Sequence, residues 1–91
     1  MFYLVSYDIP DDKRRTKLAK TIKDFGDRVQ YSVFECLLNK SLLDKMTGRI
    51  DKIIVEKEDS VRIYCLCANC EREIRVMGKG EVSKIEDVYI I

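Results

Sequence analysis

The chain has 91 residues, 46% of them hydrophobic and 36% charged, a balance that predicts one packed domain spanning residues 1–91 and argues against disorder. Its net charge of +1 gives no overall reason to expect a nucleic-acid partner, and the absence of histidine excludes mechanisms that use a histidine acid or base. No apolar run is long enough to cross a bilayer, and the N-terminus lacks the basic region of a signal peptide, so we expect a cytoplasmic protein with no membrane partner.

The first predicted element is a strand over Met1–Ile9. Its side chains alternate between two faces, and both faces are apolar near the start, so we expect the strand to be covered on both sides. One face turns polar at its end through Ser6 and Asp8, which places a carboxylate at the tip of an otherwise buried strand. Pro10 then stops the strand.

A basic amphipathic helix is predicted next, capped by Asp11 or Asp12 and ended by Gly26. Its apolar face carries Leu18, Ala19, Ile22 and Phe25. Its cations, with no acid among them, are Lys13, Arg14, Arg15, Lys17, Lys20 and Lys23. Charge is therefore segregated along the chain although the total is nearly balanced.

Arg28–Leu38 is predicted as the second strand region, and its face with Phe34 and Cys36 is expected to be the more polar one. A second amphipathic helix, with Asn39 or Ser41 as possible N-caps, is expected to run to about Val55. The remaining predicted strands are Val61–Cys67, Glu73–Met77 and Val88–Ile91.

Together these elements predict an α+β fold, a ferredoxin-like βαββαβ sandwich with an extra C-terminal strand and both helices on one face of the sheet. The other face of the sheet is left bare. Because the first strand is apolar on both faces, we expect a homodimer that forms through the open sheet face, with the C-terminal strand free to pair with the partner's sheet edge.

Asp8 is the best-placed candidate for chemistry. A Mg²⁺ or Mn²⁺ ion needs only one or two carboxylates when waters and phosphate complete its shell, and it lowers the pKa of a bound water. In a twofold dimer Asp8 occurs twice, so the dimer could complete the site. The alternative is that Asp8 only starts the turn at Pro10 or caps the helix, and periodicity alone slightly favours this alternative.

The basic helix could bind nucleic acid through phosphate contacts, which do not depend on base sequence and weaken with salt. The alternative is a solvated charged face. The lack of acids at i+4 to pair with these cations favours phosphate binding. Tyr7 and Phe34 could stack on a base, although such residues more often belong to a core.

The four cysteines include a C-x-x-C pair, Cys67 and Cys70. A structural zinc site needs four ligands, and the chain has no histidine and only Cys36 and Cys65 as further thiols. We therefore expect reduced, small thiols that are buried or half-buried at the end of the third strand.

Several motifs resemble those of the small Cas-two proteins of CRISPR systems. These are Tyr7-Asp8-Ile9 at the end of the first strand, the basic first helix, Arg28-Val29-Gln30-Tyr31-Ser32-Val33-Phe34, and Asp59-Ser60-Val61-Arg62-Ile63-Tyr64 followed by Cys67 and Cys70. The resemblance spans nearly the whole chain and is specific in the first 35 residues.

The resemblance implies a ferredoxin-like homodimer, a divalent metal (Mg²⁺ or Mn²⁺) held between two copies of Asp8, and binding of RNA or double-stranded DNA. It makes Asp8 the catalytic and metal-binding candidate. Nucleic-acid-binding candidates are Arg14, Arg15, Lys17 and Arg28, and supporting candidates are Tyr7 and Phe34. Lys17 stands where some relatives have Arg, so the charge is kept but the bidentate fork is lost.

Two functions stay open at this point. One is a metal-dependent endonuclease acting in spacer acquisition for antiviral defence. The other is a non-catalytic dimeric scaffold that holds duplex DNA for the Cas-one integrase subunit, with Asp8 doing no chemistry. A small-ligand or regulatory domain is a third possibility, but the sequence offers no ligand-pocket signature.

Overall fold

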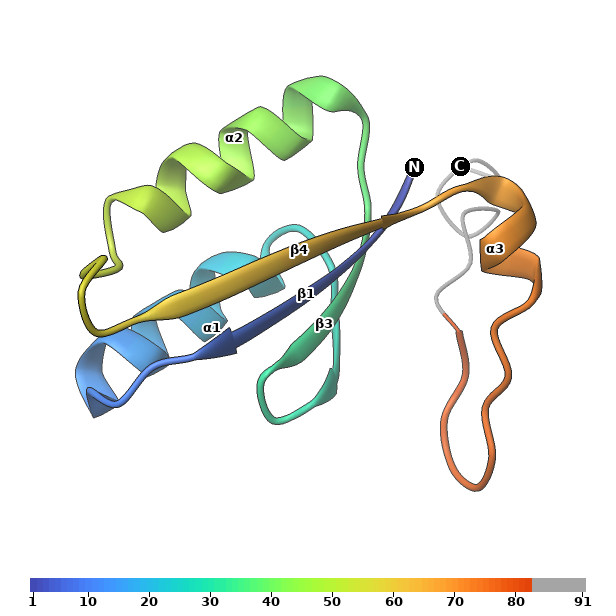
Figure 1. The fold of residues 1–91 in the computed structure, drawn as a ribbon, viewed down its shortest axis with the longest axis horizontal. Coiled ribbons are helices and arrows are strands. Elements are labelled where there is room, and N and C mark those ends of the chain that lie inside the picture. The colour runs from blue at the N-terminus through green and yellow to red at the C-terminus, as the bar shows by residue number, and fades with distance from the viewer. Residues whose placement is uncertain (83–91) are drawn as a thin grey trace.

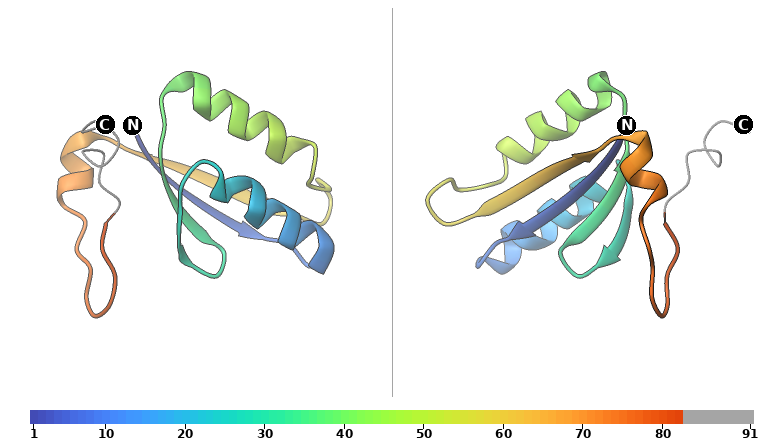
Figure 2. Two further views of the ribbon diagram at one scale, coloured as in Figure 1. Left: turned by 180° about the vertical axis from the view of Figure 1, so that it is seen from behind. Right: turned by 45° about the vertical axis from the view of Figure 1, so that its right-hand side comes forward.

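The chain folds into a four-stranded antiparallel sheet with two long helices packed on one of its faces (Figures 1 and 2). The computed structural model describes residues 1–82. Its elements are β1 (Phe2–Asp8), α1 (Asp12–Lys23), β2 (Asp27–Gln30), β3 (Val33–Leu37), α2 (Lys40–Asp51), β4 (Ser60–Leu66) and α3 (Ala68–Arg72).

The strands lie in the order β2-β3-β1-β4, so β1 is central and pairs antiparallel with both β3 and β4. This order and the placement of α1 and α2 confirm the predicted ferredoxin-like βαββαβ arrangement. The predicted C-terminal strand, Val88–Ile91, lies outside the described residues, and dimerisation through the open sheet face stays a prediction.

Polar side chains fix the start of both long helices. The Asp11 carboxylate accepts a hydrogen bond from the Arg14 backbone N–H at 2.9 Å, so Asp11 and not Asp12 is the N-cap of α1. In the same way Asn39 caps α2 by accepting from the backbone N–H of Leu42 at 2.8 Å. α2 ends at Asp51, earlier than its apolar spacing predicts.

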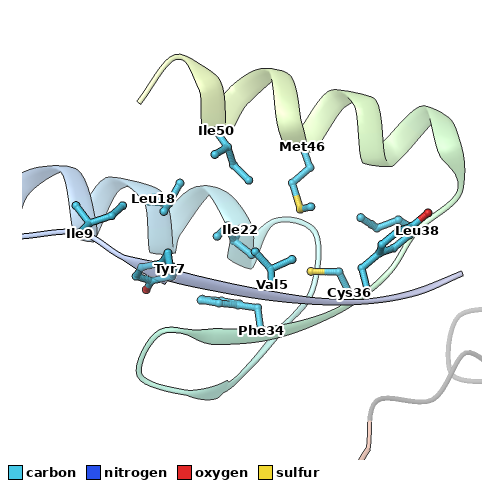
Figure 3. Close-up of a cluster of buried hydrophobic side chains, with 11 residues drawn as sticks. Val5, Tyr7, Ile9, Leu18, Ile22, Phe34, Cys36, Leu38, Met46 and Ile50 are labelled. Carbon is cyan, nitrogen blue, oxygen red and sulfur yellow. The ribbon is translucent and has the colours of Figure 1, made fainter. Parts of the chain in front are cut away.

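The core lies between the helices and the sheet (Figure 3). β1 contributes Val5 and Tyr7, and α1 contributes Leu18 and Ile22, all buried. The other members labelled are Ile9, Phe34, Cys36, Leu38, Met46 and Ile50, and Tyr3 completes the cluster. Alternation along β1 therefore turns Leu4, Ser6 and Asp8 to the opposite, open face of the sheet.

The prediction of a more polar face with Phe34 and Cys36 was wrong, because both side chains are fully buried against the helices. The error comes from treating residues 28–38 as one strand. A turn after Gln30 separates β2 from β3, and the register shifts between Arg28 and Gln30. Alternation counted through this hairpin therefore assigns side chains to the wrong face.

The prediction of a strand over Glu73–Met77 was also wrong. The chain leaves β4 through the short helix α3, and residues 73–77 form no strand. Apolar alternation at Ile74 and Val76 indicates a face to bury, but it does not supply a neighbouring strand edge with which the backbone can pair.

Candidate functional site

Asp8 is the last residue of β1 and lies opposite Ser60, the first residue of β4. Its side chain is exposed, on the open face of the sheet. Within residues 1–82, the Asp8 carboxylate has no hydrogen-bond or ion-pair partner. Because Asp11 caps α1, the alternative in which Asp8 caps this helix was wrong. The Asp8 carboxylate thus has a fixed position in the fold, and no other described residue of the chain binds it.

Arg15 holds the loop that follows Asp8. Its Nη1 donates to the backbone carbonyls of Ile9 at 2.9 Å and Pro10 at 3.3 Å. Its Nη2 forms an ion pair with the Asp12 carboxylate. The guanidinium therefore fixes the turn from β1 into α1, while the Arg15 side chain as a whole remains 44% exposed and can meet a ligand.

Tyr7, Arg28 and Phe34 form one cluster on the helix side of the sheet. The Tyr7 hydroxyl accepts from Arg28 Nη2 at 3.3 Å and donates to the Tyr31 carbonyl at 3.2 Å. The Arg28 guanidinium lies 5.3 Å from the centre of the Phe34 ring, and the rings of Tyr7 and Phe34 are 6.3 Å apart. Neighbouring residues of a strand point to opposite faces, so this cluster supports the backbone at Asp8 and does not surround its carboxylate.

Arg14 is engaged inside the molecule. Its Nε and Nη2 donate to the two carboxylate oxygens of Asp59 at 2.8 and 3.1 Å, and Nη2 also contacts Glu58 at 2.9 Å. The Asp59 side chain is fully buried, and it also accepts from the backbone N–H of Val55 at 2.8 Å. The hydrogen bond from Arg14 holds the pKa of the Asp59 carboxyl below its usual range. Arg14 thus braces α1 against the loop before β4.

Lys17 differs from Arg14 in this respect. It is exposed on α1 together with Lys13 and Lys20, and none of the three has an ion-pair partner among the described residues. We call these three residues the lysine stripe. The stripe carries positive charge that no contact within residues 1–82 compensates, and the same holds for Lys23 at the C-terminal end of α1.

The family model for CRISPR associated protein Cas2 matches residues 1–74. The chain belongs to the Cas2 family. It is 43% identical to the CRISPR-associated endoribonuclease Cas2 1 of Chloroflexus aurantiacus, in an alignment that covers all of both chains. It is 39% identical to the CRISPR-associated endonuclease Cas2 2 of Thermus thermophilus, over 98% of this chain and 94% of that protein.

A solved structure called a partial Cas6-RT-Cas1--Cas2 complex contains a chain of the same fold. The TM-score is 0.73 and the identity 29%, over 84% of this chain and 89% of that chain. These similarities confirm the Cas2 resemblance drawn from the sequence.

Within this Cas2 chain, the predicted site residues divide into three groups. Arg15 contacts the backbone directly after Asp8 at the carboxyl end of β1, without a contact to the Asp8 carboxylate, while Tyr7, Arg28 and Phe34 meet on the other side of the sheet. Lys17 lies apart on the outside of α1. Sequence reasoning missed Asp59 as the partner of Arg14, because the two residues are 45 positions apart and no local spacing connects them.

The described residues contain no group of three or more metal-ligating side chains. A cation at Asp8 would thus depend on waters, on phosphate and on a second copy of the chain for its other ligands. In residues 1–82 no helix is long and apolar enough to cross a membrane.

Proposed function

We propose that this chain is a metal-dependent endonuclease that hydrolyses phosphodiester bonds of RNA or double-stranded DNA during CRISPR spacer acquisition, acting as a cytoplasmic homodimer with one Asp8 from each protomer. The observation that carries the proposal is the free, exposed Asp8 carboxylate at the end of the central strand. The names of the two Cas2 relatives, an endoribonuclease and an endonuclease, support the same reaction class.

The residues present fit a Mg²⁺ or Mn²⁺ ion. Asp8 offers a hard oxygen ligand without an internal competitor, and the open sheet face can bring a second Asp8 from a twofold partner. When bound, such a cation would neutralise charge on the phosphate and make water acidic enough to attack phosphorus at neutral pH.

The other residues act on position and charge. Arg15 fixes the loop behind Asp8 and has an exposed side that can contact a phosphate oxygen. The Tyr7, Arg28 and Phe34 cluster stiffens the strand that carries Asp8. Lys17 and its neighbours in the lysine stripe attract the backbone of the nucleic acid at longer range.

The test uses purified protein with labelled RNA and duplex DNA, with and without Mg²⁺ or Mn²⁺. Asp8→Asn keeps the shape of the side chain and removes the charge of the ligand, so we expect loss of cleavage with retained folding and dimerisation. Asp44→Asn removes the same charge from an exposed position on α2 and should cleave normally. Full cleavage by Asp8→Asn would refute the catalytic role of this carboxylate.

The lysine stripe favours a second function, that of a non-catalytic scaffold that holds duplex DNA for a Cas1 integrase subunit. Phosphate contacts and shape would carry this function, and the metal ligand would not. The presence of a Cas2-like chain in a complex named for Cas1 and Cas2 supports it.

An integration assay with the cognate Cas1 protein separates the two functions. If the scaffold role is the main one, Asp8→Ala should still bind duplex and support integration, whereas Lys17→Glu with Lys20→Glu should abolish both. Loss of integration in a folded, dimeric Asp8→Ala protein that still binds DNA would refute the scaffold role and show that the function requires the Asp8 carboxylate.

A further inference from the structure

The end of β4 carries a group of exposed thiols that the proposed function does not use. Cys65, Cys67 and Cys70 are all exposed, and Cys36 is buried in the core. The expectation of buried or half-buried thiols at this position was therefore wrong. The sequence alternates through β4, but α3 begins immediately afterwards and turns Cys67 and Cys70 outward.

Cys67 and Cys70 are in direct contact across the first turn of α3. The Cys67 sulfur accepts a hydrogen bond from the backbone N–H of Cys70 at 3.4 Å. Both side chains are exposed on the same short turn. Residues three apart in a helical turn are surface neighbours, close enough for a disulfide without a large backbone movement.

The same contacts make the two thiols unequal. Hydrogen bonds from the backbone and the side chain of Cys70 lower the pKa of the Cys67 thiol, because they stabilise its thiolate. The pKa of the Cys70 thiol is raised by its hydrogen bond to Cys67. A pair in which one thiol has a lower pKa than its adjacent neighbour is the arrangement of an attacking and a resolving cysteine.

We propose that Cys67 and Cys70 form a thiol–disulfide exchange site for small-molecule disulfides, with Cys67 as the attacking and Cys70 as the resolving cysteine. The Cys67 thiolate attacks one sulfur of glutathione disulfide, forms a mixed disulfide and releases one glutathione thiolate. Cys70 loses its proton to solvent, attacks the Cys67 sulfur and releases the second glutathione. Two protein thiols are oxidised to one disulfide while one external disulfide is reduced to two thiols.

Cys65 is not part of this pair. It lies opposite Tyr3 in the β1–β4 ladder. Two residues before Cys67 along the strand, it precedes the turn that brings Cys67 and Cys70 together. Cys65→Ser therefore removes an exposed thiol next to the site and serves as the matched control.

Oxidation of Cys67 and Cys70 would place a covalent bond in the turn that connects β4 to α3. α3 contacts β4, and residues 74–77 and 79–82 beyond it line a hollow together with Val33, Glu35 and Leu37 of β3. A Cys67–Cys70 disulfide closes the turn at which the chain leaves β4.

The experiment treats the reduced full-length protein with glutathione disulfide and follows intact mass, followed by peptide mapping. Wild type and Cys65→Ser should lose two hydrogens without retaining glutathione, and dithiothreitol should reverse the change. Cys70→Ser should accumulate glutathione on Cys67. Cys67→Ser should lose the internal disulfide. Circular dichroism checks that each variant is folded.

Three outcomes would overturn the proposal. The first is loss of the internal disulfide in Cys65→Ser. The second is a Cys70→Ser protein that carries no more glutathione on Cys67 than on Cys65. The third is stoichiometric Zn²⁺ retained by the reduced wild type and lost in Cys67→Ser, because the thiolates would then be metal ligands.

Discussion

The lysine stripe allows a quantitative test of how this chain contacts nucleic acid. Lys13, Lys17 and Lys20 have no ion-pair partner within the described residues, whereas Arg14 on the same helix is neutralised by Asp59 and Glu58. Replacement of the three lysines by Gln removes three cations from α1 and leaves its apolar face unchanged. We expect the variant to bind duplex DNA with a weaker dependence on salt.

The magnitude follows from counterion release. Each phosphate contact contributes about 0.9 to the slope of log K against log salt, so three contacts on one protomer contribute about 2.7. Between about 50 mM and 200 mM salt, the wild type should therefore lose about 40-fold more affinity than the triple variant. This ratio concerns only contacts made by the stripe, since all other contacts are common to both proteins.

Fluorescence anisotropy with one labelled duplex at several salt concentrations measures both slopes. The matched control replaces three exposed lysines with Gln, namely Lys40 and Lys45 of α2 and its C-cap Lys52, and it should keep most of the wild-type slope. Arg14→Gln should also keep the slope, because its charge is already compensated. An unchanged slope in the stripe variant, or a clear drop in Arg14→Gln, would refute the reasoning.

Three further results are expected. Gly26→Ala should cost about 1–3 kcal/mol in urea unfolding, because a Cβ there would lie 2.3 Å from the Glu35 carbonyl oxygen. Gly48→Ala has open space and should stabilise α2 by about 0.5–1 kcal/mol; destabilisation there would contradict the packing. The lowered pKa of Asp59 contributes stability above its unfolded pKa, about 3.9, which is lost as pH falls through the folded pKa. The free energy of unfolding of Asp59→Asn, measured over a pH series, should therefore be lower than that of the wild type at neutral pH and should fall less in acid. Identical dependence on pH in the two proteins would contradict a stabilising contact between Arg14 and Asp59.

Local patterns in the sequence predicted the parts of the fold that depend on short-range contacts. The alternation in β1 placed Asp8 at the polar end of a buried strand, and the apolar spacing of α1 identified the face with Leu18 and Ile22. These predictions succeed because burial of one face imposes a period that can be read directly from the residues.

The predictions that failed depend on contacts between distant segments or on turns. No local spacing links Arg14 to Asp59, so the basic helix had one fewer available cation than its sequence indicates. The turn between β2 and β3 reversed the faces assigned to Phe34 and Cys36. The spacing of the cysteines likewise does not predict which thiols are exposed. Cys67 and Cys70 are exposed because the chain turns into α3 directly after β4.

The central place of β1 has a consequence for motion near Asp8. The Tyr7 N–H donates to the Ser32 carbonyl on the β3 side, and Val5, two residues earlier, directs its N–H to the same side, so fraying of the edge strand β4 does not expose these two amides. The amides of Val5 and Tyr7 should therefore exchange hydrogen for deuterium only through opening of the whole sheet. The backbone that leads to Asp8 would then stay in place during local opening of an edge strand, whereas the exposed lysines of α1, which lie apart from Asp8, can change conformation independently.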